Sequence, residues 1–196
     1  MVLIDDDALD DLEREFVSRV RGRVLEIGAG EGENFGAFHP EVEWVGLEPD
    51  SKRRAELATR AREWKHPAVP LDARAESIPL PDHSIDAVVG TYVLCSVGDV
   101  DATLAELRRV LVPGGRIVLV DHVIAPPGTL KRAVQLVATP WSKRFCHGCH
   151  WNRDPEPALA AAGFIGSDIR RLRVRSMPWG PVPMLLFDGR APLDAG

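Results

Sequence analysis

The stretch that most restricts how this chain can fold is V-L-E-I-G-A-G-E-G-E-N-F, at residues 24–35. A short apolar run stops at Gly28, and two further glycines follow at Gly30 and Gly32. Glycine lets a backbone turn sharply, approach a ligand closely and point its N–H groups at that ligand. We therefore expect a buried strand here, followed by a ligand-binding loop that opens a helix.

An acidic residue stands near the end of the next apolar run, W-V-G-L-E-P-D, at Glu48. Open α/β sheets bind ligands outside the carboxyl ends of their strands, where an acid can accept the hydroxyl groups of a ribose. The glycines and Glu48 together predict a cofactor with a nucleoside part, either a nicotinamide dinucleotide or S-adenosylmethionine (SAM). The structural alternative is a tight strand-to-helix turn in some other α/β protein.

The spacing of the glycines separates the two cofactors. The dinucleotide fingerprint is G-x-G-x-x-G/A, and Glu33 occupies the place of its third small residue. The order G-x-G-x-G, preceded by an acid at Glu26, instead resembles motif I of the class I SAM-dependent methyltransferases.

Helical and strand periodicities alternate along the rest of the chain. Predicted helices cover residues 5–20, 51–64, 99–111 and 158–163. Predicted strands cover residues 24–28, 44–50, 68–72, 85–91, 116–122, 169–175 and 184–188, with V-P-G-G-R at 112–116 as a turn. Such alternation predicts an α/β fold with a parallel sheet and helices on both of its faces.

Composition excludes several classes of protein. The length of 196 residues suits one domain, and a net charge of -5 argues against a nucleic-acid partner, which normally requires a basic face. No apolar stretch approaches the ~20 residues that span a bilayer, and the first residues do not read as a signal peptide. Three cysteines, Cys95, Cys146 and Cys149, favour a reducing compartment. We expect a cytoplasmic protein.

Further segments are similar to the same methyltransferase class, in the same order along the chain. They are A-E-S-I-P-L-P-D-H-S-I-D-A-V-V at 75–89 and L-R-R-V-L-V-P-G-G-R-I-V-L-V at 107–120. The resemblance implies a Rossmann-like, doubly wound, seven-stranded sheet in a single domain over residues 1–196. One departure is Arg74, where family members often carry an acid. The residues that the motifs place against SAM are Glu26, Gly28, Ala29, Gly30, Gly32, Asn34, Glu48, Pro49, Ala75, Glu76, Thr91 and Leu94.

Four shorter segments resemble the alkyl thiol S-methyltransferases, which in mammals are membrane-associated. They are T-Y-V-L-C-S-V at 91–97, D-H-V at 121–123, G-C-H-W-N-R-D at 148–154 and W-G-P-V-P at 179–183. The resemblance implies methyl transfer to a small thiol. We expect no membrane attachment, because the hydrophobic N-terminal anchor of those relatives has no counterpart here. The alternatives are O-, N- or C-methylation of a natural product or quinone-like ring, an NAD-dependent oxidoreductase, and a non-catalytic SAM-binding module.

The acceptor side is predicted from the strand ends and from an irregular insert at residues 125–157. His122 ends the predicted strand 116–122, so it is our candidate catalytic residue, as general base or as a group that orients the acceptor. It can equally be a neutral histidine hydrogen-bonded behind the pocket. Cys95 is expected as a lining residue, because methyl transfer from SAM needs no covalent enzyme intermediate. The expected acceptor wall consists of Cys95, Trp141, Phe145, Cys149 and Trp151.

The string F-C-H-G-C-H-W at 145–151 contains C-x-x-C-H, a pattern of haem attachment, zinc binding or a redox dithiol. Haem attachment normally follows export, and a redox dithiol belongs at a strand-to-helix turn. Zinc needs four tetrahedral ligands, normally from two separated pairs, whereas these candidates are adjacent and His122 is the remote addition. We therefore predict no metal, and we interpret the second half of the string as part of a lid or acceptor wall.

Overall fold

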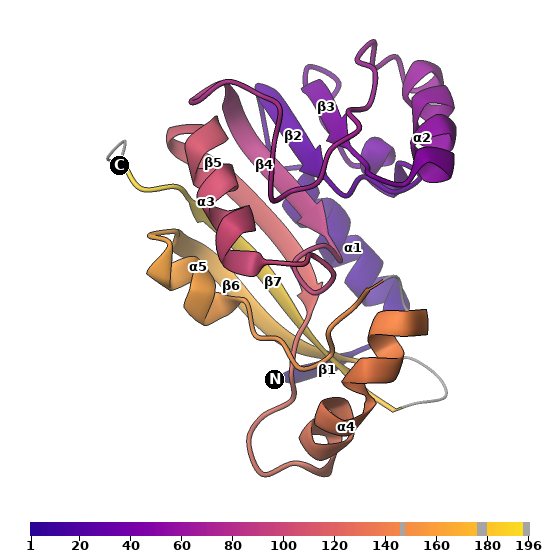
Figure 1. Cartoon of the computed structure of the whole chain (residues 1–196), viewed down its shortest axis with the longest axis vertical. Helices are drawn as coiled ribbons and strands as arrows, with labels where there is room; N and C mark the ends of the chain where they lie inside the picture. The colour runs from indigo at the N-terminus through magenta and orange to yellow at the C-terminus, as the bar shows by residue number, and fades with distance from the viewer. Residues whose placement is uncertain (146–147, 176–179, 194–196) are drawn as a thin grey trace.

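The molecule is built around one mixed sheet, shown in Figure 1. This computed structural model describes residues 1–145, 148–175 and 180–193, and in that part of the chain seven strands pair in the order β1-β6-β7-β5-β4-β2-β3. The strands are β1 (Val2–Ile4), β2 (Arg23–Ile27), β3 (Glu43–Leu47), β4 (Ile85–Thr91), β5 (Leu111–His122), β6 (Ile165–Val174) and β7 (Val182–Arg190). Strand β7 runs antiparallel to β5 and β6, so the sheet is not wholly parallel as the alternation predicted.

Helices cover both faces of the sheet, which confirms the expected doubly wound arrangement. On one face, α1 and α2 bury apolar side chains such as Phe16 and Leu57 against the strands. On the other face, α3 and α5 bury Leu107 and Leu159. The helices are α1 (Asp6–Val17), α2 (Ser51–Glu63), α3 (Val100–Val110), α4 (Leu130–Phe145) and α5 (Glu156–Ala161), with a 3-10 turn, η1 (Glu33–Gly36).

Three of these helices have an aspartate as the capping residue directly before their first turn. The side chain of Asp5 accepts a hydrogen bond from the Ala8 N–H at 3.0 Å, and Asp99 accepts from Ala102 at 3.0 Å. Asp50 accepts from the N–H groups of both Lys52 and Arg53. These bonds satisfy N–H groups that have no partner within the helix. They confirm the predicted starts of the first three helices to within one residue.

The strand predicted over residues 68–72 is wrong. In this segment Leu71 makes a single bridge to Leu47 in β3, and no ladder forms within this described segment. Pro67 and Pro70 lack the N–H that a ladder requires. The seventh strand is instead β1, three residues at the N-terminus that pair in parallel with β6.

Two further expectations needed correction. Residues 112–116 are not a turn outside the sheet but belong to β5, where the pairing with β4 shifts register between Ile85 and Ala87. The insert is not irregular throughout, because it contains the 16-residue helix α4 with Pro140 inside it. Figure 1 shows α4 beyond one end of the sheet, outside both helical layers. In the described part of the chain, no helix has both the length and the apolar character needed to cross a bilayer.

Candidate active site

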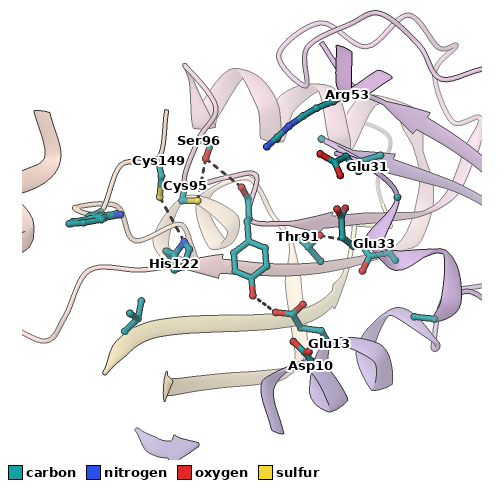
Figure 2. A pocket seen from close by; sticks show the side chains of 18 of the residues that line it. Asp10, Glu13, Glu31, Glu33, Arg53, Thr91, Cys95, Ser96, His122 and Cys149 are labelled. Carbon is teal, nitrogen blue, oxygen red and sulfur yellow. Dashed lines mark hydrogen bonds between the residues drawn. The ribbon is translucent and has the colours of Figure 1, made fainter. Parts of the chain in front are cut away.

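A cavity of about 1430 Å³ opens at the carboxyl ends of β2, β4 and β5 (Figure 2). Its wall includes nine of the residues predicted from the sequence, namely Gly28, Ala29, Gly32, Asn34, Thr91, Cys95, His122, Cys149 and Trp151. Helices α1, α2 and α4 supply further parts of the wall, through residues such as Glu13, Arg53 and Val134. Parallel strands that end together create this kind of crevice, so the position agrees with the fold.

The glycine loop forms one end of the cavity. Gly28, Gly30 and Gly32 all have positive φ, at 57°, 57° and 85°, a conformation that other residues adopt at a cost. A Cβ added at Gly32 would meet Cδ2 of the buried Phe35 ring at 2.6 Å. The loop leads into the short η1 turn rather than into an α-helix, which corrects the expected helix start. Bare backbone therefore faces the cavity at this end.

Glu48 lies behind the loop, at the end of β3. Its Oε2 accepts a hydrogen bond from the Gly30 N–H at 3.0 Å, and its Oε1 accepts from the Asp50 N–H at 2.9 Å. Each carboxylate oxygen has a second lone pair, so both can still accept from a ligand hydroxyl. Glu48, the acid that we predict to bind ribose, therefore also fixes the position of the glycine loop.

Glu26 is buried beneath the loop rather than exposed on the wall. Its Oε1 accepts from the Asn34 side-chain amide at 2.7 Å, and its Oε2 accepts from the Trp44 indole N–H at 2.7 Å. Asn34 also donates to the Thr91 hydroxyl at 3.0 Å. Burial raises the pKa of Glu26 to about 7, although both hydrogen bonds lower it. Its place makes Glu26 a positioning residue for Asn34 and Thr91.

Several other residues predicted to bind the cofactor lie outside the wall. The Glu76 carboxylate accepts from the Gly98 N–H at 2.7 Å, so it holds the turn before α3. Ala75 and Leu94 are buried in the core, where apolar side chains belong. Gly30 and the buried Glu48, which bond to each other, are not among the lining residues, and neither is the exposed Pro49.

Three side chains that are far apart in the sequence meet at the other end of the cavity (Figure 2). The ligand atoms of Cys95, His122 and Cys149 all lie within 4.8 Å of one another. Cys149 Sγ is 3.8 Å from His122 Nδ1. The Cys149 thiol, and then burial, raise the pKa of the Cys95 thiol to about 12. Cys95 is therefore protonated at neutral pH, which supports the expectation that it is no nucleophile by itself.

Asp121 lies directly behind this cluster, with 1% of its surface exposed. Its Oδ1 accepts a hydrogen bond from the Cys95 N–H at 3.0 Å. Its Oδ2 is buried and has no hydrogen-bond partner among the described residues. Burial raises the pKa of this carboxyl well above its ordinary value. A buried carboxyl oxygen without a hydrogen-bond partner is costly. Such an atom is often found at a functional site.

The Arg153 guanidinium ties the second half of the cysteine–histidine string to the Cys95 loop. Its Nη1 donates to the carbonyl oxygens of Leu94, at 3.0 Å, and Val97, at 2.6 Å. The His150 N–H donates to the Cys95 carbonyl oxygen at 2.6 Å. These bonds explain why Cys149 faces His122. Cys146 and His147, the first half of the string, lie outside the described residues.

The sequence reasoning missed a polar wall between the two ends. Tyr92 has a positive φ of 61°, and its hydroxyl donates to Glu13 on α1. Its ring centroid lies 5.1 Å from that of His122. Burial raises the pKa values of both Glu13 and Tyr92. The adjacent Thr91 was predicted, but the approach of α1 had no signal in a single sequence.

The aromatic wall is only partly as predicted. Trp151 lines the cavity. Trp141 does not: it is 62% exposed, and the last residue of α4 that lines the cavity is Ala138, almost one helical turn earlier. The expected role of Trp141 is therefore not supported, because α4 runs past the rim. The side chain of Phe145 lies outside the described part of the structure. Gln135 instead fixes α4: its amide donates to the Val123 carbonyl oxygen at 3.1 Å and accepts from the Ala125 N–H at 2.7 Å.

Known proteins match both the sequence and the fold. A family model of the methyltransferase domain matches residues 25–119. Thiol S-methyltransferase TMT1B of Homo sapiens is 31% identical over 185 residues, which is 89% of this chain and 75% of the human protein. TMT1B of Rattus norvegicus is 32% identical over 82% of this chain, which spans 64% of the rat protein, less than two thirds.

The fold matches a solved methyltransferase with a bound product of SAM. Geranyl diphosphate C-methyltransferase of Streptomyces coelicolor, crystallised with S-adenosyl-L-homocysteine, superposes with a TM-score of 0.74 at 16% identity, over 94% of this chain and 81% of that one. The bare glycine loop and the Glu48 carboxylate at adjacent strand ends fit the adenosyl part of SAM. Fold and site together define a class I methyltransferase that uses SAM. The chain belongs to the methyltransferase family that includes thiol S-methyltransferase TMT1B.

Proposed function

We propose that this enzyme transfers the methyl group of SAM to the sulfur atom of a small apolar thiol. The observation that carries the proposal is the cavity wall, which combines His122 with apolar side chains of α4 such as Leu130 and Val134. The similarity to TMT1B supports sulfur as the acceptor atom. A thiol has a reference pKa near ~8.5 and is partly ionised at neutral pH, so it needs little help from a base.

The chain's own residues position the two reactants. The glycine loop and Glu48 hold the adenosyl part of SAM, which supplies an activated methyl group. His122 orients the acceptor, and Cys95, Cys149 and Trp151 form the acceptor wall. We further propose that residues 125–157 act as a lid on this side, since Gln135 anchors α4 to the segment that follows β5. Holding both reactants away from water is the main catalytic contribution that such a reaction requires.

Methylation at oxygen, nitrogen or carbon of a larger apolar molecule is the second candidate. The volume of about 1430 Å³ favours it, because a cavity for one drug-sized ligand measures roughly 300–1,000 Å³. The cavity must also hold SAM, so the volume remaining still suits a thiol with a short alkyl chain.

The experiment that separates the candidates is a panel of acceptors with methyl-labelled SAM. The panel pairs alkyl thiols of increasing chain length with alcohols, amines and phenols of matched size, and product is measured as labelled thioether, ether or amine. We expect turnover with the thiols, rising with chain length, because the α4 wall buries the added methylene groups. Turnover confined to phenols or amines would overturn the thiol proposal.

A further inference from the structure

We propose that Cys95, His122 and Cys149 bind a zinc ion at the floor of the cavity and leave its fourth coordination position open to the acceptor thiol. The inference rests on the proposed function, because the open position is assigned to that acceptor. It also reverses our prediction of no metal. That prediction considered the C-x-x-C-H string with His122 as a remote addition, whereas the cluster takes only Cys149 from the string and adds Cys95 from the loop after β4.

The distances fit a tetrahedral ion. Zinc binds thiolate sulfur at ~2.3 Å and imidazole nitrogen at ~2.0 Å, so its ligand atoms lie about 3.5–3.8 Å apart. The three ligand atoms here lie within 4.8 Å of one another, and Cys149 Sγ is 3.8 Å from His122 Nδ1. Binding zinc therefore requires the ligand atoms to move closer together by about 1 Å at most. The described residues offer three ligands here, and three protein ligands with one open position are the usual arrangement of catalytic zinc.

Charge around the cluster also fits a cation. Among the residues that the structure describes, no hydrogen-bond donor reaches the buried Asp121 Oδ2. Zinc would hold both cysteines as thiolates and would lie beside the Asp121 carboxylate, whose Oδ1 fixes the Cys95 backbone. Carboxylates directly behind the ligands commonly orient zinc sites. With the Arg153 guanidinium nearby, two thiolates, one carboxylate and one zinc ion sum to zero net charge.

The cluster is held in place before any ligand binds. Arg153 and the His150 N–H fasten the segment that directly follows Cys149 to the Cys95 loop. Gly148 has a φ of 85°, and a Cβ there would lie 3.3 Å from the Ser96 carbonyl oxygen. Glycine thus allows the close approach that brings Cys149 to His122. A site fixed in this way loses little entropy on binding a metal.

The chemistry of the site follows from the open position. An acceptor thiol binds zinc through sulfur as a thiolate, and its proton leaves to solvent through the open cavity. The thiolate sulfur then forms a bond to the methyl carbon of SAM as the bond from that carbon to the sulfonium sulfur breaks. The products are a neutral thioether, which is a weak zinc ligand and dissociates, and S-adenosylhomocysteine. Electrons and charge balance with no other reactant.

The test measures metal binding directly, in reducing buffer. Purified protein should contain about one equivalent of zinc. Cobalt substitution should give a thiolate-to-cobalt charge-transfer band with visible bands of a four-coordinate ion. Cys95→Ser, Cys149→Ser and His122→Asn should each weaken zinc binding at least about a hundredfold in a chelator competition. His39→Asn is the matched control, because His39 is on the surface and pairs with Glu41. Retention of wild-type affinity by Cys95→Ser would overturn the proposal, because Cys95 lies outside the C-x-x-C-H string.

Two further measurements separate this inference from the proposed function. Binding of S-adenosylhomocysteine shows that each variant is folded, and an alkyl thiol added to the cobalt protein should shift its spectrum as a third thiolate binds. A spectrum unchanged by saturating thiol overturns the open acceptor position. If zinc-depleted protein methylates thiols at the rate of zinc-loaded protein, the zinc inference fails and the proposed function stands. If zinc binds as described and no thiol is methylated, the proposed function fails and the metal site stands.

Discussion

Cys149 Sγ lies 3.8 Å from His122 Nδ1, although the two residues are 27 positions apart in the chain. The contact depends on Arg153, which binds two carbonyl oxygens of the loop that carries Cys95. The acceptor end of the cavity is therefore assembled by backbone anchoring rather than by contacts among the reactive side chains themselves.

Replacing Arg153 by lysine should disturb the acceptor end and spare the cofactor end. A lysine ammonium is a compact point charge and cannot bridge the Leu94 and Val97 carbonyl groups as the guanidinium fork does. We expect kcat/KM for a thiol to fall about tenfold, the Kd for SAM to change less than about threefold, and the free energy of unfolding to fall by about 1–3 kcal/mol. Steady-state kinetics, calorimetry and urea unfolding measure the three quantities.

Arg171→Lys is the matched control for that variant. Arg171 forms ion pairs with Asp154 and Glu156, which directly follow Arg153 in the chain. Arg171 itself is partly exposed and does not line the cavity. Partly exposed ion pairs contribute little, so we expect less than about 1 kcal/mol of destabilisation and unchanged kinetics. Equal kinetic losses in both variants would show that Arg153 acts through general stability alone.

The parts of the fold that follow from local pattern were predictable. Strands β2, β3 and β4 and the second half of β5 are short, mostly apolar runs, and three helices begin at aspartates. Strand β1 is only three residues long and mostly exposed, so it carries no apolar pattern. Helix α4 was missed because Pro140 and the prolines before it suggested a break. Its stability comes instead from tertiary contacts such as those of Gln135.

The candidate site divides in the same way. The glycine loop and Glu48 belong to two adjacent segments with a recognisable spacing, so the cofactor end was predictable. Cys95, His122 and Cys149 come from three segments, and their meeting depends on hydrogen bonds from Arg153 to carbonyl groups. Every residue has a backbone carbonyl group, so a single sequence does not indicate which of them a side chain will bind.

Glu48→Gln should weaken the binding of SAM. The carboxylate accepts from two backbone N–H groups, and a glutamine amide offers one oxygen and turns its NH₂ group toward the second donor. We expect the Kd for SAM to rise about tenfold to a hundredfold, equivalent to about 1.4–2.7 kcal/mol. Isothermal titration calorimetry measures it. Glu43→Gln is the control, because Glu43 is exposed at the other end of β3 and pairs with Arg23. A Kd within twofold of wild type for Glu48→Gln would remove Glu48 from the cofactor site.

Gly32→Ala and Gly128→Ala should separate the cost of backbone conformation from the cost of crowding. Both glycines have positive φ, 85° and 78°, but an added Cβ at Gly128 meets nothing within 4 Å. At Gly32 it meets the buried Phe35 ring. We expect Gly128→Ala to cost about 1 kcal/mol and Gly32→Ala about 3 kcal/mol or more in urea unfolding. Equal costs would mean that the Phe35 ring moves aside freely.

Glu26→Gln should change how stability depends on pH. Burial raises the pKa of Glu26 from an ordinary value near 4.5 to about 7. Between these values the folded protein binds a proton that the unfolded chain has lost, so the free energy of unfolding falls as pH rises. The full effect is about 3 kcal/mol, and it is absent in the variant because glutamine does not titrate.

We therefore expect the stability of Glu26→Gln, relative to wild type, to improve by about 3 kcal/mol between pH 4.5 and 7.5. Urea unfolding at half-unit pH intervals measures this difference, in which the titration of all other groups cancels. Glu43→Gln, at an exposed position, should follow the wild-type curve in parallel. A change in the opposite direction would show that the hydrogen bonds from Asn34 and Trp44 outweigh burial and keep Glu26 ionised. In that case the loop would rest on a buried carboxylate throughout the physiological range.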